Sequence, residues 1–379
     1  MPRPPRFPRR SVSAASLLLV LLAAPVARGQ QAVTIVVAGP VTGASAPVGE
    51  QMRRGAGLAI EDLNAAGGVL GRPLRMEMQD DACDPKQAVA VANLAATRGA
   101  RFVVGHACSG ASLPASAVYA EEGVLMISPA SSNPALTDEA AAKGWNTIMR
   151  LYGRDDAQGD FVGRWVAENK PGARVAVVDD QTAYGRGLAE RVRASLAARG
   201  MAPVLNAAVT RGERDFNALV ARLKEARPDL IYFGGYPVEA GLLLRQGREQ
   251  GLNATLMSGD SLVTPDFWNV TGPAGEGTLM TFPPEPRANP AAQGVVERLR
   301  AAGFDPEGFT LYTYAAVQAI AAGAARAGAL DPARVAAALR GGAPVPTVLG
   351  PVAFDAKGDI KDPRFAIYVW RDGQYREQQ

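Results

Sequence analysis

Short runs rich in β-branched residues alternate with helix-like stretches along the first 130 residues of this chain. The expected strands are at 33–38, 74–79, 101–105 and 124–128, and the expected helices at 49–66, 85–97 and 112–122. Strands that are apolar throughout and separated by amphipathic helices are typical of a parallel sheet covered on both faces. The pattern therefore predicts an α/β fold with helices on both sides of the sheet.

The same alternation starts again after Gly153. Further strands are expected at 174–179, 204–209, 230–234 and 255–257, and further helices at 158–169, 187–199, 216–226 and 239–251. A chain of 379 residues is also longer than one compact core usually accommodates. The sequence therefore predicts two similar α/β lobes.

The last hundred residues break this regularity. A proline-rich stretch at 281–289 is expected to cross between lobes, and helices are expected at 291–302, 309–327 and 332–340. Strands at 348–354 and 365–370, with a turn at 355–358, suggest a terminal hairpin. We therefore expect an N-terminal lobe of 30–152 plus 283–347 and a C-terminal lobe of 153–282 plus 348–379. Their cleft would lie at the carboxyl ends of the parallel strands, where open α/β sheets bind ligands.

The N-terminus has the features of a signal peptide. Four arginines precede a short apolar run, and small residues before Gly29 suggest cleavage there. The pair Arg9-Arg10 leaves the twin-arginine export route open beside the general one. Removing residues 1–29 takes away five arginines and leaves 35 basic against 37 acidic residues. The sequence therefore predicts an exported, periplasmic protein with no nucleic-acid partner.

The chain has two cysteines, Cys83 and Cys108. Two cysteines in an exported protein usually pair, and closing this loop would stabilise the fold by about 3–4 kcal/mol in the chain-entropy model. A catalytic thiol needs a base, and a zinc site needs more ligands than two cysteines and His106, the only histidine, provide. We therefore expect a structural disulfide, no metal site and no cofactor.

Several long strings resemble the periplasmic leucine/isoleucine/valine-binding proteins. They include DDACDPKQAVAVAN (80–93), GHACS (105–109), EEGVLMISPA (121–130), YGRGLAERV (184–192), DFNALVARLK (215–224), YFGGYPVEAG (232–241) and GPVAFDAKGDIK (350–361). The resemblance runs from about residue 33 to residue 370. It implies a monomeric, two-lobed solute receptor of an ATP-driven (ABC) amino-acid importer, which closes on its ligand and passes it to a membrane permease.

The carboxylate and the ammonium group of a free amino acid require different partners. Cys108 and Ser109 precede an expected helix, and their backbone amides suit a carboxylate. The hydroxyl-rich stretch at 131–134 follows a strand end and offers a second such loop, while the ammonium group needs an ionised acceptor, for which Asp260 and Asp155 are the candidates. Tyr184 and Tyr236 would supply aromatic walls with polar tips.

The resemblance assigns roles to the same segments. It implies that Ser109 and Ser132 hold the carboxylate and that the Ala130 carbonyl and Asp260 hold the ammonium group. It also implies that Asp155, Tyr184 and Tyr236 line the pocket. The chain departs from the family at Val48, where relatives carry an aromatic ring, at Asp260, where they carry the longer glutamate, and at Ser132, where they carry threonine. The side chain of the ligand is therefore left open.

Parts of the sequence also resemble two other classes of protein. Residues 259–262 spell the GDSL signature of a lipase and esterase family, but Ser261 lies deep in the chain and the only histidine, His106, lies far upstream. A serine without a base is a poor nucleophile, so we expect no enzyme. A sensory ligand-binding module, or a binding protein for urea, a small amide or an aromatic acid, remains the alternative.

Overall fold

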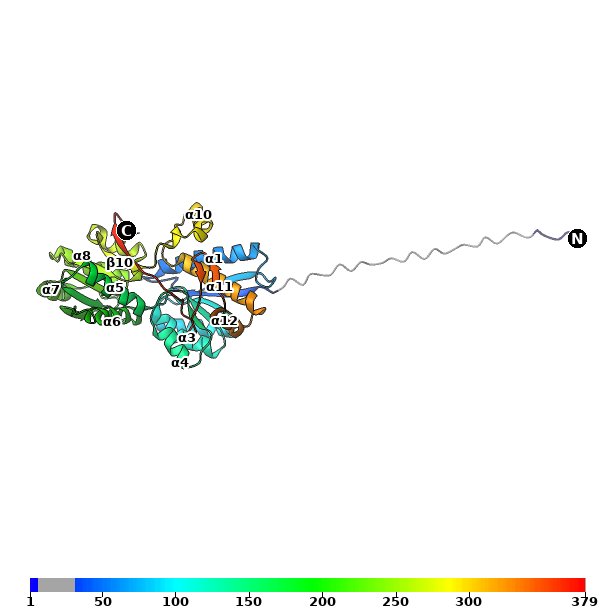
Figure 1. Cartoon of the computed structure of the whole chain (residues 1–379). Coiled ribbons are helices and arrows are strands. Elements are labelled where there is room, and N and C mark those ends of the chain that lie inside the picture. Colours follow the sequence, from blue (N-terminus) through cyan, green and yellow to red (C-terminus); the bar gives the residue numbers. More distant parts are fainter. Residues whose placement is uncertain (6–30, 379) are drawn as a thin grey trace.

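The computed structural model describes residues 1–5 and 31–378 (Figure 1). The expected signal peptide therefore lies outside the described residues, apart from its first five. Among the described residues, no helix combines the length and apolar character that a membrane span requires. Figure 1 shows two lobes side by side, each with its own central sheet.

The first sheet has five parallel strands in the order β2-β1-β3-β4-β5. They are β1 (Val33–Gly39), β2 (Leu74–Asp80), β3 (Phe102–Gly105), β4 (Leu125–Ser128) and β5 (Ile148–Arg150). Almost every residue of β1, β3, β4 and β5 is buried. Continuous apolar runs predicted β1, β3 and β4, which agrees with their burial, whereas β5 was not predicted.

The second sheet has seven strands in the order β14-β13-β10-β9-β8-β6-β7. The parallel strands are β6 (Val175–Asp179), β7 (Leu205–Ala208), β8 (Leu230–Gly234), β9 (Thr255–Ser258) and β10 (Leu279–Phe282). Two antiparallel strands, β13 (Ala366–Arg371) and β14 (Gln374–Glu377), extend the sheet beyond β10.

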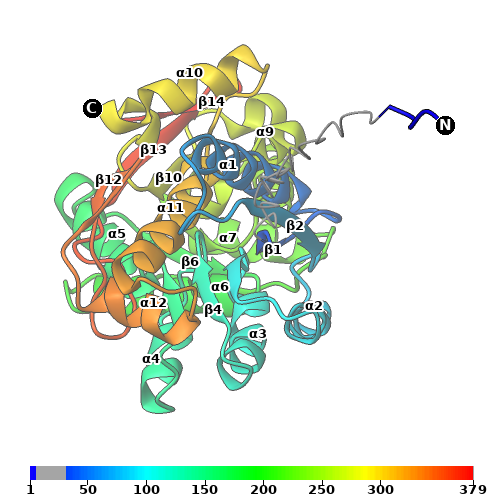
Figure 2. The same cartoon turned by 90° about the vertical axis from the view of Figure 1, so that its right-hand side faces the viewer.

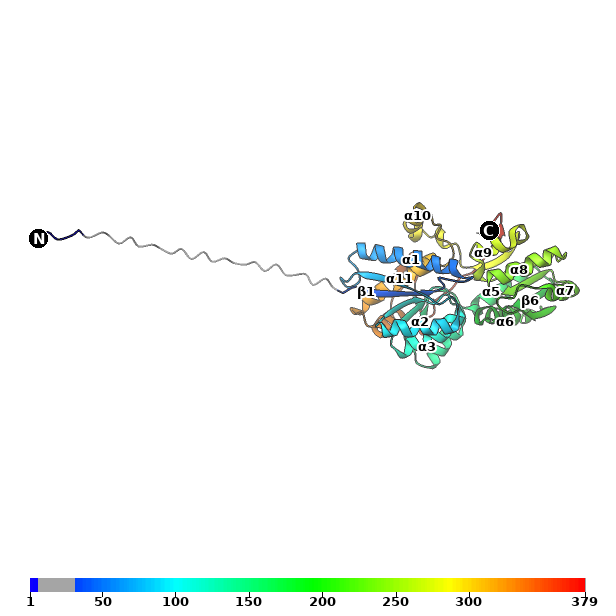
Figure 3. The same ribbon diagram turned by 180° about the vertical axis from the view of Figure 1, so that it is seen from behind.

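Helices cover both faces of each sheet. On the first sheet, α1 and α11 pack together on one side while α2 and α3 pack together on the other (Figures 2 and 3). On the second sheet, buried residues of α5 and α6 form one apolar layer and those of α7 and α8 belong to another. The helices are α1 (Ala46–Ala65), α2 (Pro85–Thr97), α3 (Ser109–Glu121), α4 (Ala135–Ala142), α5 (Asp155–Asn169), α6 (Ala183–Ala197), α7 (Asn217–Ala226), α8 (Pro237–Glu249), α9 (Asp266–Thr271), α10 (Gln293–Ala301), α11 (Thr310–Ala327) and α12 (Pro332–Arg340).

The chain returns to the first lobe after β10. Arg298 of α10 forms ion pairs with Glu61 and Asp62 of α1, and α11 packs along α1. These contacts place α10 and α11 against α1, while the bounds of the lobes stay a prediction. The reason for the packing of α11 is its apolar face, which is buried along most of its length and needs a second helix layer to cover it.

The predicted terminal hairpin is wrong. The strand expected at 348–354 is replaced by β12 (Gly350–Val352), which pairs with β11 (Val345–Thr347). The strand expected at 365–370 is β13, and it pairs with β14 through a turn at Asp372 and Gly373, both with positive φ. An Asp-Gly pair in this conformation makes the tight turn that matches strand twist.

The contacts of 355–359 also bear on the lobe boundaries. The backbone N–H of Arg150 in β5 donates to the Gly358 carbonyl, and Asp359 accepts from Arg150 and from Thr137 of α4. This segment therefore lies against the first lobe. We propose that the last crossing lies at 360–366, rather than at 348, and that the first two lie at 151–154 and 283–292.

Candidate functional site

A small cavity of about 40 Å³ lies between the two lobes, beside the carboxyl ends of strands from both sheets. Eight residues predicted for the ligand site line it: Val48, Cys108, Ser109, Ala130, Ser132, Tyr184, Tyr236 and Asp260. The structure therefore brings together side chains that are up to 212 positions apart in the chain. These residues remain predictions as ligand contacts, because their position shows only that they share one cavity.

The first lobe contributes a helix start and a hydroxyl loop. Cys108 is the N-cap of α3 and Ser109 its first residue, three positions earlier than the helix expected at 112. The Ser109 hydroxyl accepts a hydrogen bond from the Asn133 backbone N–H at 3.2 Å, which joins the helix start to the loop containing Ser132. The first N–H groups of a helix lack partners within the helix, so the start of α3 suits a carboxylate.

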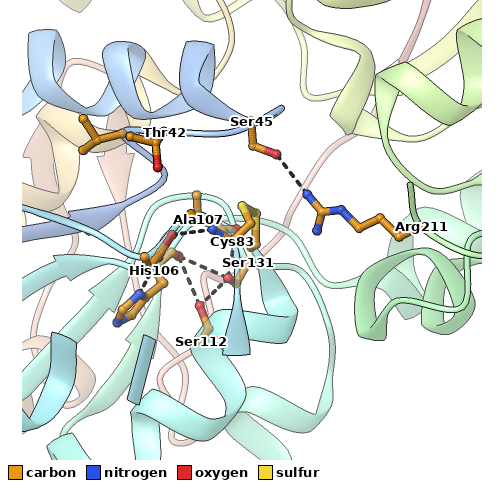
Figure 4. Close-up of a disulfide and its surroundings, with 12 residues drawn as sticks. Thr42, Ser45, Cys83, His106, Ala107, Ser112, Ser131 and Arg211 are labelled. Atoms are coloured by element: carbon orange, nitrogen blue, oxygen red, sulfur yellow. Dashed lines mark hydrogen bonds and ion pairs between the residues drawn. A yellow bond between two sulfur atoms is a disulfide. The ribbon is translucent and has the colours of Figure 1, made fainter. Parts of the chain in front are cut away.

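The predicted disulfide is present in this wall. Cys83 and Cys108 are bonded with their Cα atoms 5.5 Å apart, a usual separation. Figure 4 shows the bridge beside His106 and Ser131. The His106 ring is fully buried, with Nδ1 2.6 Å from Asp81 and Nε2 3.1 Å from the Tyr119 hydroxyl. The bonded cysteines and the enclosed histidine therefore form a structural unit behind the cavity.

The second lobe contributes one buried carboxylate with hydrogen-bond donors around it. Asp260 follows β9, and its Oδ1 accepts from the Tyr184 hydroxyl at 2.9 Å and from Gln158 Nε2 at 3.2 Å. Burial raises the pKa of Asp260 to about 6, and these two hydrogen bonds partly offset the rise. The ring of Tyr236 packs against that of Tyr184 with centroids 5.4 Å apart. At neutral pH this wall offers an ionised acceptor suited to a cation.

Asp155 occupies a different place from the one expected. It is fully buried at the start of α5, and its backbone N–H donates to the Ser132 carbonyl at 2.9 Å, but it is not among the residues that line the cavity. Neither carboxylate oxygen forms a hydrogen bond of good geometry within the described residues. Burial, reinforced by the charge of Asp260 and opposed by the nearby Ser132 hydroxyl, raises the pKa of Asp155 to about 8.

The raised pKa of Asp155 predicts an unusual pH dependence. Because the folded state holds this proton more tightly than the unfolded chain, the group stabilises the fold at low pH and loses that contribution as pH rises from about 4 to about 8. Asp155→Asn should therefore match the wild type near pH 4 and be about 2–5 kcal/mol more stable at pH 8. Urea unfolding of the ligand-free protein at pH 4, 6 and 8 measures this difference.

The neighbouring Asp156 is a matched control. Burial alone would raise the pKa of Asp156. Its side chain accepts a hydrogen bond from Arg154, however, and this bond together with the Arg154 charge lowers the pKa overall. Asp156 therefore stabilises the fold at pH values above its unfolded pKa of about 4, so Asp156→Asn should be less stable than the wild type by a nearly constant amount from pH 8 to pH 5. A stability difference for Asp155→Asn that stays constant from pH 4 to pH 8 would contradict the assignment.

The contacts of Ser261, the serine of the GDSL string, indicate a structural role. The Ser261 hydroxyl donates to the Gly235 carbonyl at 2.6 Å and so joins two loops of the second lobe. The imidazole of His106 is enclosed in the first lobe by Asp81 and Tyr119. The serine and the only histidine of the chain are therefore not arranged as nucleophile and base.

Sequence reasoning missed about half of the cavity wall. The additional lining residues are Ala44, Ser45, Ala107, Pro237, Ser261, Thr264, Asp266 and Phe309. Most lie in turns or at helix starts, where no periodicity marks the side that faces the cleft. Pro237 and Ala107 adjoin predicted site residues and could have been found from that alone, whereas Phe309 reaches the cavity only because the chain returns to the first lobe.

Comparison with known proteins gives consistent matches. A family model described as periplasmic binding protein matches residues 32–374. The Leu/Ile/Val-binding protein homolog 1 of Brucella melitensis is 45% identical over 362 residues, which cover 94% of this chain and 96% of the relative. An amino acid binding protein of Pseudomonas aeruginosa is 47% identical over 349 residues, 91% of this chain and 92% of the relative.

A solved structure agrees with these matches. The leucine binding protein LivK of Thermotoga maritima superposes with a TM-score of 0.84 at 25% identity, covering 92% of this chain and 98% of that one. The predicted two-lobed α/β fold and the predicted family resemblance are both confirmed. Since the family model spans nearly all of the described chain after residue 30, this chain belongs to the periplasmic binding protein family.

Proposed function

We propose that this protein captures a free amino acid, with a branched-chain or other aliphatic side chain, between its lobes and delivers it to the permease of an ABC importer. One observation carries the proposal. The same cavity is bounded on one side by the start of α3 with Ser109 and on the other by the buried carboxylate of Asp260. A zwitterion is the ligand class that matches donors on one lobe and an anion on the other.

The lining and the relatives both favour an aliphatic ligand. Val48, Pro237 and Phe309 give the cavity apolar walls, which suit an aliphatic side chain. The Brucella relatives are named as Leu/Ile/Val-binding homologues, and the Thermotoga structure is that of a leucine binding protein.

The remaining expectations follow from this role. We propose a monomeric binding protein of the periplasm that performs no chemistry on its ligand and needs neither cofactor nor nucleic acid. Support comes from the relatives, which are named as binding proteins, and from the arrangement of Ser261 and His106, which lacks a nucleophile–base pair. Ligand-driven closure requires only that the ligand contact both lobes in the closed state.

A ligand screen with matched analogues tests the proposal. L-Leucine, L-isoleucine and L-valine should raise the melting temperature, and calorimetry should give the dissociation constants. N-acetyl-L-leucine lacks the ammonium group and L-leucinamide lacks the carboxylate, so each should bind at least about 100-fold more weakly than leucine. Urea, acetamide and benzoate form the comparison set. Binding of one of these three, with none by any of the twenty amino acids, would refute the proposal.

A further inference from the structure

Arg211 lies outside the cavity wall but touches a wall residue of each lobe. We infer that it is a positioning residue, which holds Tyr236 in place and latches the lobes together at the cavity mouth. The inference rests on the proposed function, since it concerns the closed state that traps the ligand. Figure 4 shows the Arg211 side chain reaching from the second lobe toward Ser45 of the first.

The second lobe holds the loop of Arg211 firmly. The backbone N–H of Gly212 donates to Oε1 of the buried Glu239 at 2.7 Å, and the Thr210 N–H donates to Glu213 Oε2 at 2.9 Å. Gly212 has a φ of +87°, a conformation that a residue with a side chain rarely adopts. The backbone on each side of Arg211 is therefore fixed before the lobes meet, and little backbone order has to be gained on closure.

The guanidinium then lies over one wall of the cavity. The Arg211 Cζ atom is 4.2 Å from the ring centroid of Tyr236, well within cation–π range. The Tyr236 N–H donates to Asp180 at 3.2 Å, and its ring packs against Tyr184. Since Tyr236 lines the cavity and Tyr184 donates to Asp260, Arg211 supports the face of the second lobe that the ligand would meet.

The contact with the first lobe uses a hydroxyl that its own helix leaves free. Ser45 is the N-cap of α1, a position where serine normally accepts from the first turn of the helix. Its side chain makes no capping bond here, and instead accepts from Arg211 Nη2 at 3.3 Å. Val48 follows within the same turn and also lines the cavity. The Arg211 contact therefore lies at the same helix start that contributes Ser45 and Val48 to the cavity wall.

A contact between lobes is made only when they are closed. The Arg211–Ser45 bond therefore stabilises the closed state whether or not a ligand is present, and it slows the opening that releases one. It should strengthen binding of all ligands by the same factor, because it touches the walls rather than the ligand. This distinguishes a latch from a residue that selects a ligand side chain.

Arg211→Ala should weaken L-leucine binding about 10-fold, with most of the change in the dissociation rate. The same factor should apply to L-valine and L-isoleucine. Ser45→Ala should give about a 3-fold loss, and Arg211→Lys should recover part of the affinity because it keeps the charge. Arg214→Ala, an exposed arginine of the same loop, is the control and should leave affinity unchanged. Stopped-flow and calorimetry measure these values.

A second readout does not depend on the ligand. Both native cysteines are bonded, so spin labels can be attached at Lys86→Cys on α2 and Lys224→Cys on α7, which are exposed and lie on different lobes. Without ligand, Arg211→Ala should reduce the short-distance population. If wild-type protein bound no amino acid, the proposed function would fail while this measurement still tested the latch.

Three results would overturn the inference. One is a distance distribution and a leucine affinity that both stay unchanged in Arg211→Ala. Another is an equal loss in Arg214→Ala, which would indicate a general charge effect. The third is a change confined to acidic ligands such as L-glutamate, which would make Arg211 a ligand contact instead of a latch.

Discussion

Asp260→Ala should weaken binding of L-leucine by about 30- to 5,000-fold, equivalent to about 2–5 kcal/mol. The ammonium group of the ligand would be enclosed at a wall where Tyr184 and Gln158 donate hydrogen bonds to Asp260, whose carboxylate supplies the negative charge. Asp260→Asn keeps the shape and removes the charge, and should lose nearly as much. Calorimetry at pH 7.5 measures both variants.

Asp266 provides the control for Asp260. It lines the same cavity, but it is half-buried and close enough to the Thr264 hydroxyl for a hydrogen bond. Asp266→Asn should change the leucine affinity less than about 3-fold. If Asp260→Asn and Asp266→Asn lose affinity equally, binding depends on the total negative charge of the second lobe and not on one acceptor for the ammonium group. If Asp260→Asn binds normally, Asp260 does not contact the ammonium group.

The pKa of Asp260 adds a pH test. In the ligand-free protein this pKa is about 6, so a cationic ligand group must compete with a proton on the carboxylate below that value. Wild-type affinity for leucine should therefore fall as pH drops from 7 to 5, whereas Asp260→Asn should show no such fall from this site. Parallel pH profiles in the two proteins would contradict the assignment.

Arg150→Ala should reduce the free energy of unfolding by about 3–5 kcal/mol, because it removes a fully buried partner of Asp359, which then keeps only Arg154 and Thr137. Arg150 is fully buried at the end of β5, where its Nε donates to Asp359 Oδ1 at 2.5 Å. Its Nη1 also donates to the carbonyls of Ser131 and Asn133, which frame Ser132. Leucine affinity should therefore fall together with stability. Urea unfolding and calorimetry measure the two effects.

Two comparisons make the Arg150 result interpretable. The pair Arg98–Glu77 is an ion pair in which the arginine is exposed, so Arg98→Ala should cost less than about 1 kcal/mol. The double variant Arg150→Met, Asp359→Leu removes both buried charges and should recover much of the stability while leaving the carbonyls of the Ser132 loop without their donor. Recovery of stability without recovery of leucine affinity would separate the two roles of Arg150.

The sequence predicted eight of the ten parallel strands that the structure describes and most helices because each carries its own signal, but it missed β5 and also β10, whose end overlaps the crossover expected at 281–289. The strand at 230–234 is apolar at every position, and α2 has an aspartate N-cap, Asp84, followed by a proline. Weaker signals were missed. β5 has only three residues, and α4 follows a loop of serines that gives no clear start. The Asp372-Gly373 pair is a turn signal that could have predicted the pairing of β13 with β14. It was missed because the apolar run at 348–354 suggested a different partner strand.

The candidate site was predicted less completely, because it depends on how distant segments meet. Ser109 and Asp260 were found from the chemistry of a zwitterion and from the family resemblance. The partner of Arg150 lies 209 positions further along the chain, and Ser45 and Arg211 come from opposite lobes. Asp155 was expected in the cavity from its residue type, but it is not among the lining residues, and its backbone N–H donates to the Ser132 carbonyl.

The late return of α11 to the first lobe has a consequence for biogenesis. When synthesis has reached residue 282, every strand of the first sheet exists, yet the helix that packs along α1 has not been made. The half-finished lobe then exposes an apolar surface that only the last quarter of the polypeptide can shield. Folding of the first lobe therefore cannot be completed before nearly the whole chain has been translated.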